Sequence, residues 1–174
     1  VSIRERGYEA TEEEIKEIYK TKSDIFNGLP KAKRMPGALE VLTQIKENGL
    51  TPMVVTGSGQ LSLLDKLNHN FPNIFQEHLM VTAFDVKYGK PNPEPYLMAL
   101  KKAGINANQA IVIENAPLGV QAGVAAGIFT VAVNTGPLPD SALLEQGANL
   151  LFHSMNEFIE NWKNLFNTLN QTTR

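Results

Sequence analysis

The sequence predicts an α/β fold in which helices cover both faces of a parallel sheet. From residue 51 onwards, apolar runs of strand length alternate with stretches of helix length, an order typical of βαβ units. The run at 110–113 is continuously apolar, as a parallel strand covered on both faces requires. The polar pair Glu114 and Asn115 follows it, and then a stretch of small residues that can lie close to the sheet. Because ligands bind at the carboxyl ends of strands in open α/β sheets, this pair marks a candidate site.

The composition excludes several classes of function. The chain has 174 residues, of which 43% are hydrophobic and 20% charged, which is ordinary for one globular core with a small appendage. Its net charge of -2 gives no electrostatic reason to expect binding to nucleic acid or to an anionic membrane. Because it has no cysteine, it cannot form disulfides, zinc–thiolate sites or thiol nucleophiles. No signal peptide or membrane-length apolar run is visible, so we expect a cytoplasmic protein.

The segment 1–34 is predicted to form a small domain that consists mainly of one helix. Thr11 and Glu14 have the spacing of a capping box, so the helix is expected to begin at Thr11. Apolar residues recur at helical spacing after it. The basic run 31–34 is expected to be a solvated connection, and the second domain is expected to span 35–174.

In the second domain, helices and strands are predicted in alternation. The first helix is expected to begin at 35–37 with Pro36 in its first turn, and Gly49 is expected to cap its end. The predicted strands are 51–55, 79–83, 110–113, 130–133 and 150–152. The other predicted helices are 61–70, 93–103, one after the turn at Asn115, 143–146, and an amphipathic closing helix at 155–169.

The loop after the first predicted strand is a candidate phosphate site. Thr56 ends that strand, and its hydroxyl and the N–H groups of Gly57 and Ser58 are of the kind that hold phosphate oxygens at the start of a helix. The alternative is that 57–59 is only a turn with an N-cap serine. A dinucleotide-binding G-x-G-x-x-G motif is not present, because Ser62 occupies the third glycine position.

Two further loops carry candidate site residues. Lys90 precedes two prolines that restrict the backbone, so its ammonium could be aimed at a phosphoryl group. The alternative is an exposed loop lysine. Glu114 and Asn115 offer oxygen ligands of the kind that Mg²⁺ prefers, although Glu114 could instead only stabilise a helix N-terminus. The three histidines lack the spacing of metal ligands, and Asp85 and Asp140 are expected to be turn residues.

Taken together, Thr56, Lys90-Pro91 and Glu114-Asn115 with Gly119 resemble the haloacid dehalogenase superfamily, and more narrowly its β-phosphoglucomutase-like phosphatases and mutases. The resemblance covers 35–155 and implies that family's Rossmann-like α/β core with part of a helical cap. It implies that Thr56 binds the transferring phosphoryl group and that Lys90 stabilises its charge. It also implies that Glu114 and Asn115 hold Mg²⁺. Substrate contacts are expected from Gly57, Ser58 and Gln60, and from Lys22 as a cap lysine.

The sequence departs from the family pattern in two ways. Asn115 stands where an aspartate is common, so we expect weaker Mg²⁺ affinity rather than its loss. The family's nucleophile lies in an Asp-x-Asp motif on an opening strand, and this chain has no Asp-x-Asp. The phospho-aspartate is therefore expected to lie outside this chain, since its aspartates would be the attacking group and the general acid and base.

The missing strand also has a structural consequence. In the family it lies between the strands predicted at 51–55 and 110–113, so its absence leaves two facing buried edges with unpaired backbone groups. We therefore do not expect the chain to hold the family fold unaided. The chain is a fragment, or another chain or a neighbouring copy fills the gap, or the two strands pair directly; we favour the fragment.

The resemblance implies Mg²⁺-dependent phosphoryl transfer on a small phosphorylated sugar, by a mutase or a sugar phosphatase. A non-catalytic phosphate-binding or interaction module is the alternative, and a Rossmann-like nucleotide binder is a weaker one. The expected partners are the sugar phosphate and a missing segment or another chain, with no nucleic acid and no membrane.

Overall fold

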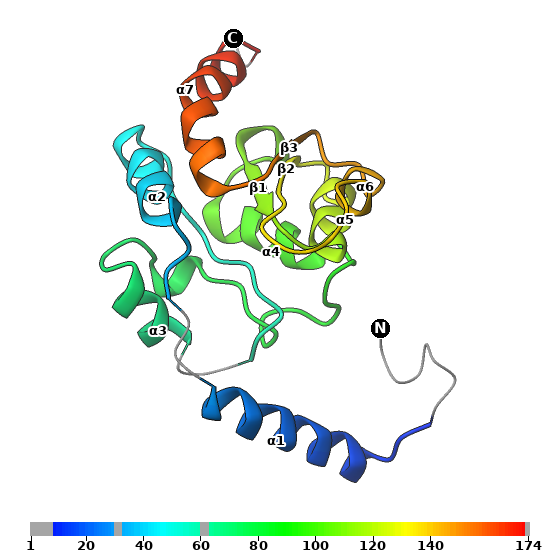
Figure 1. The fold of residues 1–174 in the computed structure, drawn as a ribbon. Coiled ribbons are helices and arrows are strands. Elements are labelled where there is room, and N and C mark those ends of the chain that lie inside the picture. Colours follow the sequence, from blue (N-terminus) through cyan, green and yellow to red (C-terminus); the bar gives the residue numbers. More distant parts are fainter. Residues whose placement is uncertain (1–8, 30–32, 60–62, 173–174) are drawn as a thin grey trace. The chain divides into compact units, whose positions relative to one another are not determined.

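The computed structural model describes residues 9–29, 33–59 and 63–172 (Figure 1). Its backbone contacts divide the chain into two units, Val1–Lys33 and Arg34–Arg174, which are described separately. Among the described residues, no helix is both long enough and apolar enough to cross a membrane.

The first unit contains helix α1, Glu12–Gly28. The predicted capping box is confirmed. The Thr11 hydroxyl accepts a hydrogen bond from the Glu14 N–H at 3.3 Å, and the Glu14 carboxylate accepts one from the Thr11 N–H at 2.7 Å. These two bonds satisfy N–H groups that a helix start leaves unpaired, which fixes where α1 begins.

The second unit is built on a parallel sheet of three strands, in the order β1 (Ile111–Glu114), β2 (Phe129–Val133) and β3 (Leu150–Phe152). Its register pairs Glu114 with Ala132, and Val133 with Phe152. The three predicted strands from 110 onwards are therefore confirmed, with β1 and β2 each shifted by one residue at the start. A parallel sheet between helices is the fold class that the sequence predicts.

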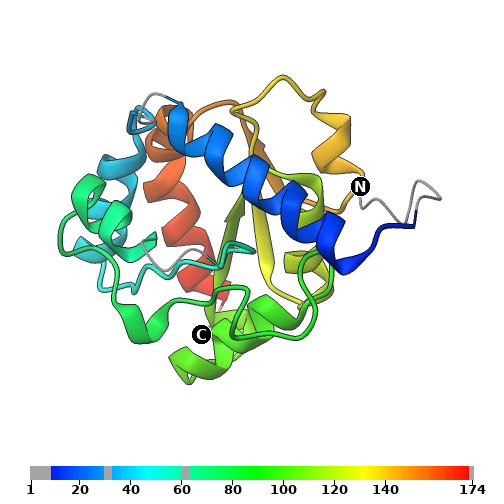
Figure 2. The ribbon, with the colours of Figure 1, turned by 90° about the horizontal axis from the view of Figure 1, so that it is seen from below.

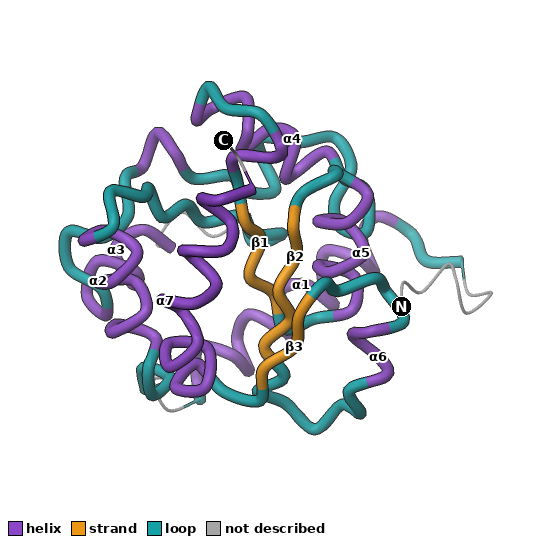
Figure 3. Tube along the Cα trace, turned by 90° about the horizontal axis from the view of Figure 1, so that it is seen from above, coloured by secondary structure: helices purple, strands orange, loops and turns teal. Residues whose placement is uncertain are grey.

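Helices cover both faces of this sheet (Figures 2 and 3). On one face, α2 (Ala38–Glu47) packs beside α7 (Met155–Thr172), and their core side chains meet Val131 and Val133 of β2. On the other face, α4 (Glu94–Ala103) and α5 (Pro117–Ala125) pack around Val112 of β1. The short helix α6 (Ser141–Leu144) packs through Leu143 against Ala132. Residues of β2 thus alternate between two separate apolar cores, as the period of a strand requires.

Small residues let α5 lie close to the strands. A Cβ added at Gly123 would stand 2.6 Å from the Thr130 hydroxyl oxygen and 3.1 Å from a Val112 methyl group. The first distance is too short for a Cβ and the second is tight, so a larger residue here would force Thr130 or the helix to shift. The sequence prediction of a closely packed small-residue helix agrees with this contact.

Of the two expectations about the ends of α2, the one for its start is wrong and the one for its end is confirmed. α2 begins at Ala38 with Gly37 as its N-cap, so the prediction that Pro36 lies in the first helical turn is wrong. Gly37 has a φ of 81°, and a Cβ there would stand 2.4 Å from Asn156 Oδ1, so the chain needs glycine at this entry to the helix. Gly49 follows the C-cap with a φ of 74°, as expected for a residue that ends a helix.

The strands predicted at 51–55 and 79–83 are not formed. They are reduced to one parallel bridge between Val55 and Val81, in which the Val81 N–H donates to Val54 at 2.8 Å. A 3₁₀ turn, η2 (Glu77–Leu79), occupies the start of the second segment, and α3 (Leu63–Asn70) lies between the two segments. The two segments share only this isolated bridge, so neither forms the ladder of hydrogen bonds that defines a strand.

A groove of about 670 Å³ separates the two halves of the predicted sheet. Val54 and Val55 line one side and Ile111 and Ile113 of β1 the other. Within the described residues, β1 pairs only with β2, so the alternative that the two strands pair directly is not met. Trp162 also lines the groove, and its buried indole N–H has no hydrogen-bond partner among the described residues.

Candidate active site

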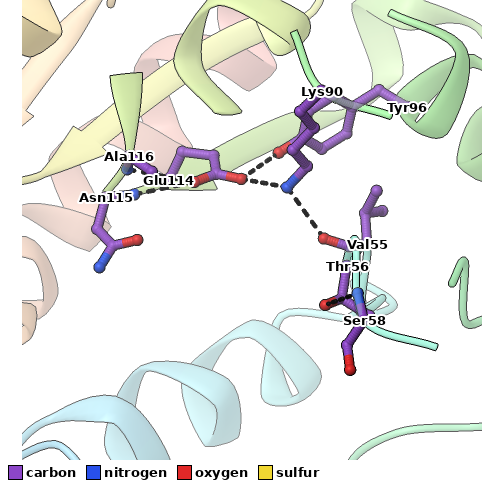
Figure 4. Close-up of polar contacts among 8 residues, drawn as sticks. All are labelled: Val55, Thr56, Ser58, Lys90, Tyr96, Glu114, Asn115 and Ala116. Atoms are coloured by element: carbon purple, nitrogen blue, oxygen red, sulfur yellow. Dashed lines mark hydrogen bonds and ion pairs between the residues drawn. The ribbon is translucent and has the colours of Figure 1, made fainter. Parts of the chain in front are cut away.

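The candidate site is centred on an ion pair between Lys90 and Glu114 (Figure 4). Lys90 comes from the loop before α4, and Glu114 is the last residue of β1. The ammonium of Lys90 also donates to the carbonyl oxygen of Val55 at 3.0 Å. The side chains are only 19% and 11% exposed, so the alternative of a solvated loop lysine is wrong. Lys90 thereby joins the end of β1 to the end of the segment across the groove.

The Glu114 carboxylate is held by four donors. Its Oε1 accepts from Lys90 and from the Tyr96 hydroxyl, the latter at 2.7 Å. Its Oε2 accepts from the backbone N–H groups of Asn115 at 3.1 Å and Ala116 at 3.4 Å. The two backbone donors are what the alternative interpretation, a carboxylate at a helix start, also expects, because α5 begins at Pro117.

Gly119 provides the space that this carboxylate occupies. A Cβ added at Gly119 would stand 2.1 Å from the Glu114 Cδ and 2.3 Å from both carboxylate oxygens. The glycine is therefore needed because the first turn of α5 lies directly against the Glu114 side chain. The motif that runs from Glu114 to Gly119 is a single packing unit in the structure.

Tyr96 was not recognised from the sequence. It lies on α4, is 6% exposed, and holds the Lys90 ammonium over its ring, with the nitrogen 4.8 Å from the ring centroid. Burial, and then the negative charge of Glu114, raise the pKa of the Tyr96 hydroxyl, which therefore stays a hydrogen-bond donor at neutral pH. Nothing in the helical pattern separates a site tyrosine from a core one, so the sequence carries no signal for it.

The loop after Val55 forms a turn closed by its own side chain. The Thr56 hydroxyl accepts a hydrogen bond from the Ser58 N–H at 3.1 Å, which supports the interpretation of 57–59 as a turn. That N–H is used within the loop, while the hydroxyl hydrogen of Thr56 has no acceptor among the contacts of the described residues. Thr56 directly follows the carbonyl to which Lys90 is bonded. The predicted substrate contact Gln60 lies outside the described residues.

The predicted metal ligands form a partial donor set. Asn115 is exposed, and its amide points away from the Glu114 carboxylate in Figure 4. Among the described residues, no group of three or more histidine, aspartate or glutamate side chains gathers in a way that could hold a metal. A carboxylate and an amide oxygen suit Mg²⁺, which commonly binds one or two carboxylates, water and substrate phosphate. Since all four acceptor positions of Glu114 are taken, direct coordination there must displace one of its donors.

The predicted cap lysine lies in the first unit. Lys22 is exposed on α1, with its ammonium 5.7 Å from the centroid of the Tyr19 ring. Its role toward a substrate phosphate stays a prediction.

The predicted turn residues form ion pairs outside the Lys90–Glu114 pair, although the turn of Asp85 contacts the Thr56 loop, where the Ala83 N–H donates to the Ser58 carbonyl at 3.3 Å. Asp85 accepts from the Thr82 N–H at 2.8 Å and pairs with Lys102 of α4 at 2.7 Å. Together these bonds lower the pKa of Asp85 to about 2, the Lys102 bond contributing most. Asp140 pairs with His153 at 2.9 Å, and both side chains are exposed.

Comparison with known proteins supplies a family for this arrangement. The family model of haloacid dehalogenase-like hydrolases matches residues 2–133. A solved structure of a candidate beta-phosphoglucomutase from Bacteroides vulgatus is 74% identical, with a TM-score of 0.91 over 97% of this chain and 68% of that one.

Curated relatives are more distant. Hexitol phosphatase A of Escherichia coli is 32% identical over 123 residues, which are 71% of this chain and 55% of the relative. A phosphorylated carbohydrates phosphatase of Thermotoga maritima is 32% identical over 135 residues, 76% of this chain and 61% of the relative. The chain thus spans between half and two thirds of the length of these two relatives.

Proposed function

The chain belongs to the haloacid dehalogenase-like hydrolase family, and we propose that it takes part in phosphoryl transfer on a small phosphorylated sugar, as a phosphatase or a phosphoglucomutase-like enzyme. The single observation that carries this proposal is the mostly buried Lys90 ammonium beside Thr56, at the carboxyl ends of two strand segments. The relatives support the substrate class, since one is named for hexitols and another for phosphorylated carbohydrates.

In this proposal Lys90 and Thr56 bind the transferring group. An ammonium has three hydrogens. Among the contacts of the described residues, Glu114 and Val55 each take one, which leaves one for a phosphoryl oxygen. The Thr56 hydroxyl donates its hydrogen to a second oxygen. Positive charge held away from bulk water stabilises the charge that develops on the phosphoryl oxygens.

Mg²⁺ is the cofactor that we propose for this site. Glu114 and Asn115 would hold it together with water and the substrate. When bound, the ion would supply further positive charge to the phosphoryl oxygens. The chain's own part is to present one carboxylate and one amide oxygen at the end of β1.

We further propose that the attacking carboxylate comes from a segment that fills the groove beside β1. The groove is flanked by two edges that both run toward Lys90, so an extended segment parallel to both would end next to the ammonium. The buried Trp162 N–H has no acceptor among the described residues, and such a segment would supply one. The carboxylate would attack phosphorus while the bond to the sugar oxygen breaks, and water or a second sugar would then take the phosphoryl group.

The first unit is proposed to be part of a helical cap. On α1 the side chains of Ile18 and Ile25 are 50% and 62% exposed, which is unusual for isoleucines on one apolar stripe. Further cap helices would cover these isoleucines. In such a cap, Lys22 would face the substrate. A cytoplasmic location likewise stays a prediction.

A complementation assay tests the proposal. The 174-residue chain is mixed with Mg²⁺, p-nitrophenyl phosphate and an extended peptide of about six apolar residues that ends in Asp-x-Asp; its control peptide ends in Asn-x-Asn. We expect turnover with the aspartate peptide only, and its loss in Lys90→Ala. Turnover by the chain alone that Lys90→Ala abolishes would show that the nucleophile lies within this chain.

A non-catalytic phosphate-binding module is the second candidate. It is favoured by one observation: the carboxylate next to Lys90 is Glu114, and all its acceptor positions are occupied. Mg²⁺-dependent binding of a sugar phosphate without turnover, even with the aspartate peptide bound, would support this candidate over the enzyme.

A further inference from the structure

Tyr96 contacts both members of the central ion pair. Its hydroxyl donates to Glu114 Oε1 at 2.7 Å, and its ring centroid lies 4.8 Å from the Lys90 nitrogen. The side chain is buried, and its ring packs in the apolar core that contains Val112 of β1. Figure 4 shows the ring beside Lys90 and the hydroxyl pointing at Glu114. A single buried side chain therefore contacts both charged groups.

The hydroxyl and the ammonium share one carboxylate oxygen. Both Lys90 and Tyr96 donate to Oε1, while Oε2 is held by backbone N–H groups. If the ammonium turns to direct its remaining hydrogen at a phosphoryl oxygen, its bond to Oε1 is weakened. The Tyr96 hydroxyl stays bonded there, so the carboxylate does not become an unpaired buried acceptor. The lysine is accordingly easier to release than it would be if it were the only donor to Oε1.

The ring has a separate effect. An ammonium over the face of an aromatic ring is attracted to it, more strongly where water is excluded. The Tyr96 ring therefore holds the Lys90 nitrogen near the Val55 carbonyl while its remaining hydrogen is directed elsewhere.

We propose that Tyr96 is a positioning residue that acts through Lys90, its hydroxyl sharing the Glu114 carboxylate so that the ammonium is free to bind a phosphoryl oxygen. This role rests on the function proposed above, since it requires Lys90 to bind phosphate. It goes beyond that function because it assigns a task to a residue outside the lysine, threonine and carboxylate motifs.

A double-mutant cycle on phosphate affinity tests the proposal. Binding of inorganic phosphate to the 174-residue chain is measured calorimetrically in Mg²⁺ for the wild type, Tyr96→Phe, Lys90→Ala and the double variant. We expect Tyr96→Phe to weaken binding about tenfold, the size of a charge-assisted hydrogen bond. We expect no added effect of Tyr96→Phe once Lys90 is alanine, because the hydroxyl acts through the lysine.

Tyr88→Phe is the matched control. Tyr88 also lies near a lysine ammonium, that of Lys87 at 5.1 Å, but it is 53% exposed and contacts neither Glu114 nor Lys90 among the described contacts. We expect the loss of the Tyr88 hydroxyl to leave phosphate affinity unchanged.

The outcomes separate this inference from the proposed function. If Lys90→Ala weakens phosphate binding but Tyr96→Phe does not, the Tyr96 role is wrong and the proposed function stands. Equal weakening by Tyr96→Phe with and without Lys90 would also overturn it, because the hydroxyl would then act independently of the lysine. If Lys90→Ala leaves binding unchanged, the proposed function fails and this role with it.

An NMR measurement distinguishes a specific effect of the hydroxyl from unfolding of the variant. Because Lys90 lies over the Tyr96 ring, we expect the ring current to shift the Lys90 ε-methylene protons upfield in the NMR spectrum. We expect this shift to persist in Tyr96→Phe, which keeps the ring, and to disappear in Tyr96→Leu. A Tyr96→Phe protein that loses the shift contradicts the proposal, because the hydroxyl is assigned a role separate from the ring.

Discussion

Lys90 and Glu114 meet across the end of β1, and the lysine simultaneously bonds to the Val55 carbonyl on the opposite side of the groove. Three segments that are far apart in the sequence are thereby brought together by one ammonium. The pair is mostly buried, so its charges interact in a medium of lower effective dielectric than water. The same burial makes loss of one partner costly, because the other charge is left behind.

Replacing Lys90 by methionine is the first test of this arrangement. The stem keeps its volume but the charge is lost, so phosphate affinity is expected to fall about 10- to 100-fold, as for one or two charge-assisted hydrogen bonds. Stability is expected to fall by about 1–2 kcal/mol, because three other donors still hold Glu114. Calorimetric titration and urea unfolding measure the two effects. Lys87→Met is the control, and equal losses in both variants would contradict a specific role.

Gly119→Ala tests the contact between α5 and Glu114. The new Cβ would stand 2.1 Å from the Glu114 Cδ, so the carboxylate must move away from Lys90 and Tyr96. We expect a loss of about 1–3 kcal/mol in the free energy of unfolding, typical of overpacking, together with weaker phosphate binding. Gly136→Ala is the control, because nothing lies within 4 Å of its Cβ position. A Gly119→Ala protein as stable as the control would contradict the geometry described for the motif.

Asn115→Asp tests the proposed metal site. A second carboxylate at the end of β1 adds one negative charge, and ligand charge tunes the affinity of oxygen sites for divalent cations. We expect Mg²⁺ to bind about tenfold more tightly, as measured by isothermal titration. Asn108→Asp adds the same charge before β1 rather than after it and is expected to change nothing. An unchanged affinity in Asn115→Asp would place the cation elsewhere.

Asp85→Asn tests the ion pair with Lys102. The pKa of Asp85 is lowered from 3.8 to about 2 in the folded protein, so its stabilising effect is fully present above about pH 4 and is lost as the pH falls toward 2. At pH 7 we expect the variant to be about 1 kcal/mol less stable, after allowing for solvent screening of a partly exposed pair.

The comparison is made by urea unfolding at several pH values. The difference between wild type and variant should shrink from pH 4 to pH 2. A difference that stays constant over this range would show that the Asp85 charge is not responsible.

The strands that were predicted correctly are those whose partners are present. β2 pairs with both β1 and β3, so the apolar runs near 111, 129 and 150 have the neighbours that a strand needs. The equally apolar runs at 51–55 and 79–83 form only one bridge, because a strand depends on neighbours that local sequence does not reveal. Residues of both runs line the groove.

For the candidate site, too, one part could be predicted from the sequence and another part could not. Thr56 and Glu114 could be proposed because each lies at the end of an apolar run, and Lys90 because two prolines restrict the backbone around it. Burial of Lys90 could not be derived, since it depends on the Val55 carbonyl and on Tyr96. Tyr96 itself occupies a position where a core aromatic residue fits equally well, and only the structure reveals the direction of its hydroxyl.

The central claim is that this chain supplies phosphate-binding groups while another segment supplies the attacking carboxylate. Mass spectrometry after a rapid acid quench tests it most directly, with the chain, the Asp-x-Asp peptide, Mg²⁺ and a sugar phosphate. The account predicts a phosphoryl group on the first aspartate of the peptide, absent when Lys90 is alanine. A phosphoryl group on a residue of the 174-residue chain itself would contradict it.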